Sequence, residues 1–346
     1  AAVAAALAGG ASRGSSGLGD VLLGSGADTG VLVVAPRARG GECDGGDGFG
    51  GGSADLASDY ASETVGDPGT PAFRVYVTRG GVRVSPWADV PLRPAGGRGS
   101  GNGAPAPDAH PLPLVHMVTE IPRGARAKLE VGTDDPPLHP LRQVCGGEKG
   151  RESWAWRPRA LARPPTPRLP APLPPQDTTA TGALRDLPPP TPFNYGMLPR
   201  TVEDAGEAWA GGADDPLLAG ARGDGDPVDA VELSASPLPL GAVTRVRMVA
   251  ALAMLDGGEL DWKVVAIDAS SPLAPAIVDV PSLEAALPGE LDRVISWFST
   301  YKPPRTDGRP AVQFGRGGLP LPADGAAAVV AGAEAAFLRM QAASKV

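Results

Sequence analysis

Three aspartates within six residues are the first place where this sequence could do chemistry. The segment GDGDPVDAVEL carries Asp224, Asp226 and Asp229, with Gly225 permitting a tight turn and Pro227 stiffening the chain. Carboxylates this close repel one another strongly where the dielectric is low, so burying them together requires cations. The spacing does not match an EF-hand loop. A solvent-exposed acidic turn is the alternative interpretation.

A second acidic segment has the spacing of a strand with one charged face. In LDGGELDWKVVAID, Asp256 is followed by Glu259, Asp261 and Lys263 at every second position, with apolar side chains between them. Successive side chains of a strand point to opposite faces, so these last three charges share a face. A solvated outer face would show the same alternation, but the VVAI that follows indicates burial on both faces.

Basic and phenolic groups alternate with further carboxylates in three other segments. They are Glu120, Lys128 and Glu130 in TEIPRGARAKLEV, Tyr195 and Glu203 in NYGMLPRTVED, and Tyr301 and Lys302 in STYKPP. Each of these residues alone is typical of an ordinary core or surface. Carboxylates alone would suggest calcium storage, whereas their mixture with Lys, Arg and Tyr suggests that a hard cation and a polyanion are held together.

The overall composition disfavours several classes of protein. A formal net charge of −8 with a pI near 5.0 argues against a nucleic-acid or anionic-membrane binder. Two cysteines and three histidines without clustering provide neither a disulfide framework nor a zinc site. No apolar run approaches the ~20 residues of a membrane helix, so we expect a soluble chain without a membrane partner.

Glycine and proline divide the chain into one compact region and several looser stretches. The 346 residues include 48 Gly and 40 Pro, too many for a single globule or a long helical bundle. Residues 1–70 are predicted to form a low-complexity leader. It is either the remnant of an organellar transit peptide or a disordered segment without a targeting signal. A folded domain is predicted over 71–340, interrupted at 144–175 by a Pro/Arg-rich insert that cannot be a central strand.

Strands come first and helices last in the predicted domain. The strand-like segments are AFRVYVTRGGVRVS (two strands around Gly-Gly), LVHMVTEIP, AKLEV, DAVELS, TRVRMVAALAML and DWKVVAID. LEAALPGELDRVISWFSTY predicts a short helix, a break at Pro288 and a longer helix, and Asp324 is the expected N-cap of the last helix. This order favours a mainly β (α+β) fold, an antiparallel barrel or sheet with flanking helices and a C-terminal helix.

Six motifs, in this order along the chain, resemble the soluble family I inorganic pyrophosphatases, most closely the eukaryotic and plastid-type members. They are PWADVPL, EIPRGARAKLEV, NYGMLPRTVED, GDGDPVDAVEL, ALAMLDGGELDWKVVAID and WFSTYKPPRTDGRPAVQF. The resemblance covers residues 70–340 outside 144–175. It implies an OB-like five-stranded antiparallel barrel with flanking helices, which hydrolyses pyrophosphate to two phosphates with several Mg²⁺ ions per site.

The resemblance also implies a role for individual residues of these motifs. Those that resemble the family's metal ligands are Asp224, Asp229, Asp261, Asp256 and Glu130, with Asp261 shared between ions. Asp226 resembles the group that accepts the proton of the attacking water. Those that resemble the phosphate-holding groups are Lys128, Arg185, Tyr195, Lys263, Tyr301 and Lys302. Glu120 and Glu203 resemble carboxylates that support the site from outside.

Departures from the family pattern lie close to these residues. Arg185 is aligned through QDTTATGALRDL, directly after the insert, and the 32 residues 144–175 have no counterpart in the family. A tyrosine of many members is Thr191 here. The motif usually written PQTWED reads PRTVED, so Val202 replaces a tryptophan that would help to pack the wall of the site.

The predicted function is therefore Mg²⁺-dependent hydrolysis of pyrophosphate by a monomer or homodimer, without a nucleic-acid partner. The resemblance to plastid-type members favours the chloroplast or another organelle, with the cytoplasm as the alternative. Two other functions remain open on the sequence alone. One is a phosphohydrolase acting on another polyphosphate or a nucleotide, and the other is a relative that binds pyrophosphate without turnover.

Overall fold

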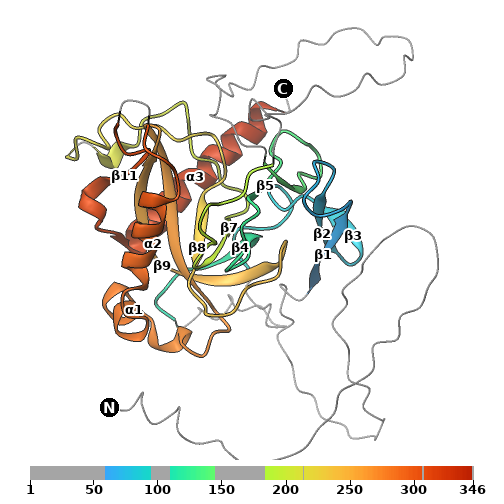
Figure 1. The fold of residues 1–346 in the computed structure, drawn as a ribbon, viewed down its shortest axis with the longest axis horizontal. Helices are drawn as coiled ribbons and strands as arrows, with labels where there is room; N and C mark the ends of the chain where they lie inside the picture. The colour runs from blue at the N-terminus through green and yellow to red at the C-terminus, as the bar shows by residue number, and fades with distance from the viewer. Residues whose placement is uncertain (1–58, 95–109, 145–183, 213, 306–307, 345–346) are drawn as a thin grey trace, which may run out of the picture. The chain divides into compact units, whose positions relative to one another are not determined.

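The computed structural model describes residues 59–94, 110–144, 184–212, 214–305 and 308–344 (Figure 1). Within these ranges the strands are β1 (Tyr60–Val65), β2 (Arg74–Arg79), β3 (Val82–Val84), β4 (Leu114–Ile121), β5 (Leu129–Val131), β6 (Leu141–Gln143), β7 (Asn194–Met197), β8 (Asp229–Glu232), β9 (Val243–Asp256), β10 (Glu259–Asp268), β11 (Val312–Phe314) and β12 (Leu321–Pro322). Residues 1–58 of the predicted leader, and all of the predicted insert except residue 144, lie outside the described residues.

The first strands form a small sheet in the order β1–β2–β6–β5, with β3 also paired to β2. The expected hairpin is confirmed, since β2 and β3 pair antiparallel across Gly80 and Gly81, which both have positive φ. β1 pairs antiparallel with β2 along its whole length, from Tyr60 to Val65. The folded region therefore begins ahead of the predicted boundary at residue 71. The segment YASETV escapes notice in the sequence because none of its residues is fully buried.

A larger sheet positions the charged residues. Its order is β10–β8–β7–β4–β9–β11, β12 also pairs with β9, and β10 pairs with β9 as well as with β8. Strands β10, β8, β7, β4 and β9 therefore form a closed ring, in which each strand pairs with the next and β9 pairs with β10. All of these pairings are antiparallel except that of β8 with β10, which is parallel. The expectation of antiparallel pairing throughout is wrong at this place, because an alternating pattern does not reveal the direction of a distant partner.

The helices are α1 (Val280–Ala286), α2 (Glu290–Thr300) and α3 (Ala323–Ala343). The predicted break at Pro288 is confirmed. Asp279 and Ser282 form a reciprocal capping box at the start of α1. The predicted N-cap Asp324 is wrong: Pro322 holds that position, and Asp324 lies in the first turn, where a carboxylate still complements the helix dipole. None of the helices in the described ranges has the length and apolarity that crossing a bilayer requires.

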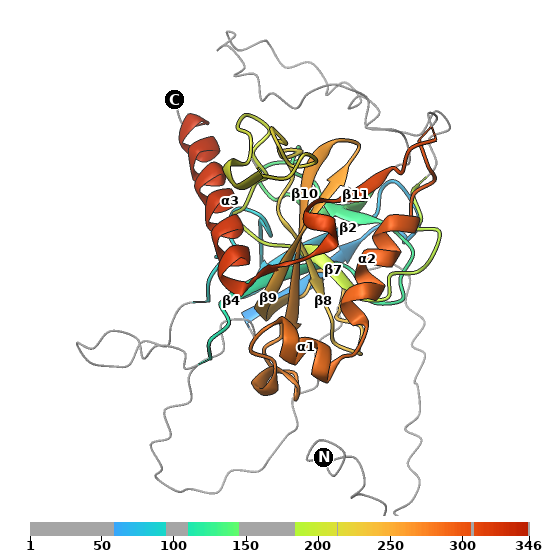
Figure 2. The same cartoon turned by 90° about the vertical axis from the view of Figure 1, so that its left-hand side faces the viewer.

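Two apolar clusters occupy opposite faces of β10 and of its partner β9. Val264 and Ala266 belong to the cluster that includes residues of α3, whereas Val265 and Ile267 belong to the one that includes residues of α1 and α2. Figure 2 shows α3 on one side of the strands, with α1 and α2 on the other. Complete burial of such a side chain contributes about 1.5–3 kcal/mol, so both helical layers hold β10 in place.

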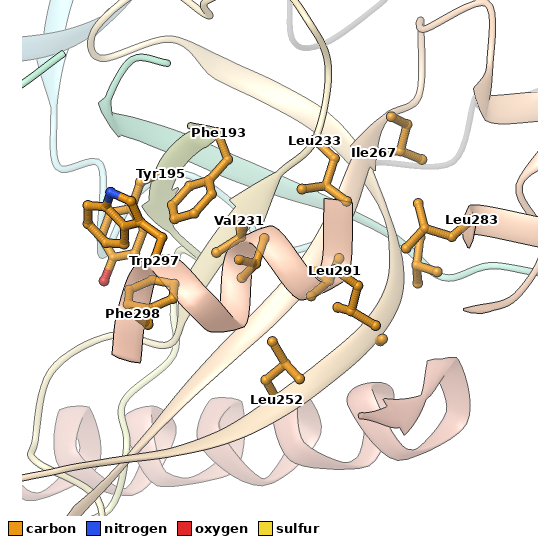
Figure 3. Close-up of a cluster of buried hydrophobic side chains, with 14 of the residues drawn as sticks. Phe193, Tyr195, Val231, Leu233, Leu252, Ile267, Leu283, Leu291, Trp297 and Phe298 are labelled. Carbon is orange, nitrogen blue, oxygen red and sulfur yellow. The ribbon is translucent and has the colours of Figure 1, made fainter. Parts of the chain in front are cut away.

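The cluster under α1 and α2 includes two of the predicted site tyrosines. Figure 3 shows Phe193, Tyr195, Trp297 and Phe298 gathered at one end of this cluster. The ring centroid of Phe193 lies 5.3 Å from that of Trp297 and 5.5 Å from that of Phe298. Tyr301 stacks on Trp297 at 4.9 Å. These ring contacts restrict the positions that the two tyrosine hydroxyl groups can take.

Candidate active site

Three neighbouring strands bring four of the predicted residues into one hydrogen-bonded group. In the register of the sheet, Lys263 of β10 stands beside Asp229 of β8, and Tyr195 of β7 pairs with a residue two positions further along β8. The Lys263 ammonium donates to carboxylate oxygens of both Asp229 and Asp261. The Tyr195 hydroxyl donates to Asp229 and lies 3.3 Å from the Lys263 nitrogen. We call Tyr195, Asp229, Asp261 and Lys263 the central cluster.

Burial and charge act in opposite directions on the lysine of the central cluster. Lys263 is only 1% exposed. Burial by itself would lower the pKa of Lys263, but the carboxylates of Asp229 and Asp261 outweigh it and hold that pKa well above its ordinary value. The lysine is therefore a fixed positive charge at neutral pH. It gives the central cluster a cation of its own.

One carboxyl of the central cluster resists ionisation. Burial raises the pKa of Asp261 to about 8, with the charges of Asp229 and Asp224 adding to the rise and Lys263 opposing it. Burial, followed by the charge of Asp229, also raises the pKa of Tyr195 well above its ordinary value, so its hydroxyl remains a donor. The central cluster thus sets two carboxyl groups against a single lysine, and burial keeps one of them from ionising readily.

Two further ion pairs extend the site beyond the central cluster. Lys302, just after α2, contacts Asp256 at the end of β9, and Lys128 contacts Glu130 of β5. Burial would raise the pKa of Asp256, but the ammonium of Lys302 brings it below its ordinary value, with Lys263 and Lys128 acting in the same direction. All three lysines therefore act on one carboxylate, which places the outer pairs and the central cluster in one electrostatic site.

The structure brings Arg185 into the same site. Its backbone carbonyl accepts from the Lys128 nitrogen at 3.0 Å, and its backbone nitrogen donates to the Val144 carbonyl at 2.7 Å. Burial raises the pKa of Tyr301 and lowers that of Lys302, and the charge of Arg185 makes a smaller, lowering contribution to both. Val144 directly precedes residues 145–183, and Arg185 follows them closely. The two residues are hydrogen-bonded to each other, and both are hydrogen-bonded to the backbone of Lys128.

The acidic turn of GDGDPVDAVEL is tied to the segment that contains Glu203. Gly225 has φ +86°, a conformation that favours glycine, and the Asp226 nitrogen donates to the Asp224 carboxylate at 2.9 Å. The backbones of Glu203 and Asp226 are joined by a hydrogen bond of 2.8 Å, and those of Gly225 and Glu203 by one of 2.9 Å. The charge of Asp224 raises the pKa of Asp261, which shows that the turn adjoins the central cluster.

Glu120 and Glu203 lie buried on two sides of the cluster. Glu120 accepts a hydrogen bond from the Val131 backbone nitrogen at 2.7 Å, and Glu203 accepts one from the Trp262 nitrogen at 2.7 Å. Burial raises both pKa values well above the ordinary range, with Asp229 adding to each rise. The second carboxyl oxygen of Glu203 has no hydrogen-bond partner.

The sequence analysis missed a polar network centred on Asn194 and Glu232, which we call the amide network. The Asn194 side chain donates to Glu232 at 2.8 Å and to the Ser236 carbonyl at 3.0 Å, and accepts from the Arg123 and Leu238 nitrogens at 2.9 and 2.8 Å. Glu232 also accepts from two backbone nitrogens at 2.9 Å. The only signal in the sequence was a Glu within the apolar run DAVEL.

The carboxylates of the site fit a hard cation by their chemistry. In the part of the chain that the structure describes, no three Asp, Glu, His or Cys side chains converge on one point in metal-ligating geometry. The carboxylates instead contact the three lysines. Within the central cluster, two carboxyl groups nevertheless face a single ammonium group, and burial raises the pKa of Asp261. Oxygen donors in such surplus are the ligands that Mg²⁺ prefers.

Comparison with known proteins identifies the same group of relatives in several independent ways. Residues 117–318 match the family described as inorganic pyrophosphatase. The chain is 35% identical over 263 residues to soluble inorganic pyrophosphatase 1, chloroplastic, of Chlamydomonas reinhardtii, covering 76% of this chain and 72% of that protein. It is 33% identical over 259 residues to soluble inorganic pyrophosphatase 6, chloroplastic, of Arabidopsis thaliana, covering 75% and 67%. The crystal structure of type I inorganic pyrophosphatase from Toxoplasma gondii superposes with a TM-score of 0.62 at 34% identity, covering 81% of this chain and 99% of that one.

Proposed function

Because this chain belongs to the inorganic pyrophosphatase family, we propose that the cluster described above hydrolyses pyrophosphate to two phosphates. The observation that carries the proposal is the convergence of Tyr195, Asp229, Asp261 and Lys263 on one buried group. Excess carboxylates beside fixed cations suit a substrate that carries high negative charge and arrives with metal ions. The family supplies the reaction, and the central cluster is its proposed place in this chain.

We propose Mg²⁺, several ions per site, as the cation of these carboxylates. The residues that would hold it are Asp224, Asp229 and Asp261, with Asp256 and Glu130 taking the ions that accompany the substrate. Mg²⁺ keeps several of its waters, so a few carboxylates suffice. When bound, it supplies neutralisation of the phosphoryl oxygens and a water of lowered pKa.

The positive side chains are the proposed phosphate-binding groups. They are Lys128, Arg185, Lys263 and Lys302, and the hydroxyl groups of Tyr195 and Tyr301 would donate beside them. The three lysines contact carboxylates in this structure. Pyrophosphate brings negative charge of its own, so we expect these ammonium groups to turn toward its oxygens. Losing one such preorganised donor typically costs about 3–4 kcal/mol in the barrier.

Asp226 is the proposed acceptor of the proton released in the reaction. A water oxygen forms a bond to one phosphorus, the bridging P–O bond breaks, and the leaving phosphate keeps that electron pair. The water proton passes to the Asp226 carboxylate and from there to solvent or product. The backbone bonds between the Asp226 turn and Glu203 hold this carboxylate in position. A positioned carboxylate base of this kind contributes about 10²–10⁴-fold.

The circuit of five paired strands supports an OB-like barrel, with one parallel pairing. We propose that a single pyrophosphatase domain reaches from β1 to α3 and that residues 144–175 interrupt it. We further propose a monomer or homodimer, which light scattering would distinguish. The two chloroplastic relatives favour the chloroplast over the cytoplasm. Imaging of the whole chain fused to a fluorescent protein tests that location.

Phosphate release from pyrophosphate, with and without Mg²⁺, tests the proposed function. We expect turnover that requires Mg²⁺ and that exceeds turnover of tripolyphosphate and ATP in direct competition. Preference for either competitor would show that the site serves another polyphosphate. Tight binding of pyrophosphate in calorimetry with no phosphate release would show a protein that retains the site without catalysis.

A further inference from the structure

One apolar side chain of α2, Phe298, contacts three of the proposed phosphate-binding groups. Its ring centroid lies 6.2 Å from that of Tyr195 and 5.7 Å from that of Tyr301. The Lys263 nitrogen lies 5.4 Å from the same centroid. Figure 3 shows Phe298 on α2, in the aromatic group that includes Tyr195. Because Phe298 carries no polar side-chain atom, neither the charged motifs of the sequence nor the hydrogen bonds of the site reveal this position.

The fold places Phe298 and the Lys263 side chain on the same face of β10. Lys263 and Val265 are two positions apart in the strand, so their side chains point to one face. Val265 belongs to the apolar cluster that also includes Phe298. Phe298 and Tyr301 are three residues apart at the end of α2, a spacing that puts both on one side of the helix. The helix therefore presents its aromatic side to the lysine of the central cluster.

The face of an aromatic ring attracts a cation because it carries partial negative charge. The attraction acts when the ammonium group lies within about 6 Å of the ring centroid, and it is stronger where water is excluded. The Lys263 nitrogen meets this distance for two rings, that of Phe298 at 5.4 Å and that of Tyr195 at 5.6 Å. Lys263 is 1% exposed, so little water competes with the rings for the ammonium group.

The other partners of Lys263 have further roles in the proposed reaction. The three N–H bonds of the ammonium group point to Asp229, Asp261 and the Tyr195 hydroxyl. Under the proposed function, the two carboxylates also serve as metal ligands, and the lysine turns toward a phosphate oxygen. A hydrocarbon ring takes no part in either exchange, because Mg²⁺ takes oxygen ligands. Phe298 is thus a partner of Lys263 that stays in place.

We propose that Phe298 is a positioning residue of the reaction, whose ring face holds the Lys263 ammonium group at the site while its hydrogen-bond partners change. This inference rests on the proposed function, because it concerns a lysine that would bind the substrate phosphate. A residue that only fills the apolar cluster would need the shape of Phe298 but not the charge distribution of its ring. This difference distinguishes the two roles.

Fluorination of the ring separates its charge distribution from its shape. Phe298 is replaced in the full chain by mono-, di- and trifluorophenylalanine, and each fluorine makes the ring face less negative with little change in its size. We expect kcat/KM for pyrophosphate to fall with each added fluorine, by about tenfold over the whole series. A kcat/KM that stays constant across the series would overturn the positioning role.

Phe193 provides the matched control. It is 1% exposed and belongs to the same apolar cluster, and its ring packs against those of Tyr195, Trp297 and Phe298. The same three fluorinated residues at position 193 are expected to leave kcat/KM unchanged. An equal decline at both positions would show that fluorine acts through the packing of the cluster, and it would overturn the proposal.

The contact between Phe298 and Lys263 is measured without turnover, by NMR of the full chain carrying isotope-labelled lysine. Protons above the face of a ring are shifted upfield. We therefore expect the Cε protons of Lys263 to show such a shift in the wild-type chain and to lose it in Phe298→Leu. If that variant folds poorly, a nuclear Overhauser effect between these protons and the Phe298 ring in the wild-type chain is the equivalent measurement.

The two measurements separate failure of this inference from failure of the proposed function. Absence of both the upfield shift and the Overhauser effect would overturn the contact, whatever the activity. Absence of pyrophosphate turnover by the wild-type chain would overturn the proposed function and the positioning role together. Normal turnover and a measured contact, with constant kcat/KM in the fluorinated series, would overturn the positioning role alone.

Discussion

The central cluster and the amide network share strands β7 and β8 and use buried polarity in opposite ways. Asn194 and Tyr195 are neighbours in β7, and Asp229 and Glu232 are both in β8. In the amide network, each oxygen of Glu232 accepts at least one hydrogen bond, and its donors are backbone or amide groups. In the central cluster, carboxylates crowd around one lysine, and one carboxyl keeps a pKa of about 8.

The difference teaches which buried polar groups serve the fold and which are available for chemistry. In the amide network, every side-chain oxygen of Asn194 and Glu232 already accepts a hydrogen bond, and breaking the network exposes the full desolvation cost of its members. Crowded carboxylates are costly in the absence of cations and become favourable when cations arrive. Substitutions in the two regions are thus expected to separate activity from stability.

The largest effect is expected from removing the proposed proton acceptor. Asp226→Asn keeps the size of the side chain but removes its negative charge, so we expect pyrophosphate hydrolysis to fall by about 10²–10⁴-fold. The melting temperature is expected to change little. The matched control is Glu259→Gln, an exposed acid-to-amide change on nearby β10, which is expected to leave turnover intact. Full activity of Asp226→Asn would refute the assignment of the base.

The amide network is expected to show the reverse behaviour. Asn194→Ala removes four hydrogen bonds and leaves Glu232 and two backbone nitrogens short of partners, so we expect a loss of about 2–4 kcal/mol in the free energy of unfolding. Urea denaturation measures it. Ser270→Ala, which removes one exposed side-chain hydrogen bond, serves as the control. If Asn194→Ala kept its stability and lost only activity, the contrast between the two regions would fail.

Arg185 tests how far the charged region extends. Arg185→Ala removes a charge that acts on Tyr301 and Lys302, and we expect the KM for pyrophosphate to rise by about 10- to 100-fold, as for a charged hydrogen bond worth about 1.5–3 kcal/mol. Steady-state kinetics provide the measurement. Arg126→Ala, which removes an exposed arginine shortly before β5 in the sequence, is the control. Equal KM values for both variants would exclude Arg185 from the substrate site.

The smallest effect concerns pH. The pKa of Asp261 rises from 3.8 to about 8 in the fold, so between these values the folded protein holds a proton that the unfolded chain has released. The stability linked to that proton is complete below about pH 4 and is lost as the pH rises through about 8. Bound Mg²⁺ replaces the proton, so we expect Mg²⁺ to raise the melting temperature by about 2–6 °C more at pH 8 than at pH 5.

Thermal unfolding in EDTA and in Mg²⁺ at both pH values provides this comparison. The Asn194→Ala variant is expected to show the same pH-dependent difference as the wild type, because the amide network lies outside the charged region. A Mg²⁺ effect of equal size at pH 5 and pH 8 would show that Asp261 does not lose a proton on metal binding.

Local patterns were sufficient for much of the architecture. The alternation of Leu260, Asp261, Trp262 and Lys263 correctly separates an apolar face of β10 from a charged one, because side-chain direction in a strand depends only on position. Pro288 correctly predicts the break between α1 and α2, since it disfavours helix at the residue before it. The ordered motifs correctly indicate the pyrophosphatase family.

The sequence by itself thus determined the elements, the charged inventory and the family, because these depend on residue type and short spacing. Tertiary structure decided the parallel pairing of β8 with β10, the place of β1, the amide network and the unpaired oxygen of Glu203. Each of these joins residues that are distant along the chain. All the groups that surround a buried carboxyl in space together decide its state. They decide whether it has a full set of hydrogen bonds, forms an ion pair with a lysine, or keeps an oxygen without a partner.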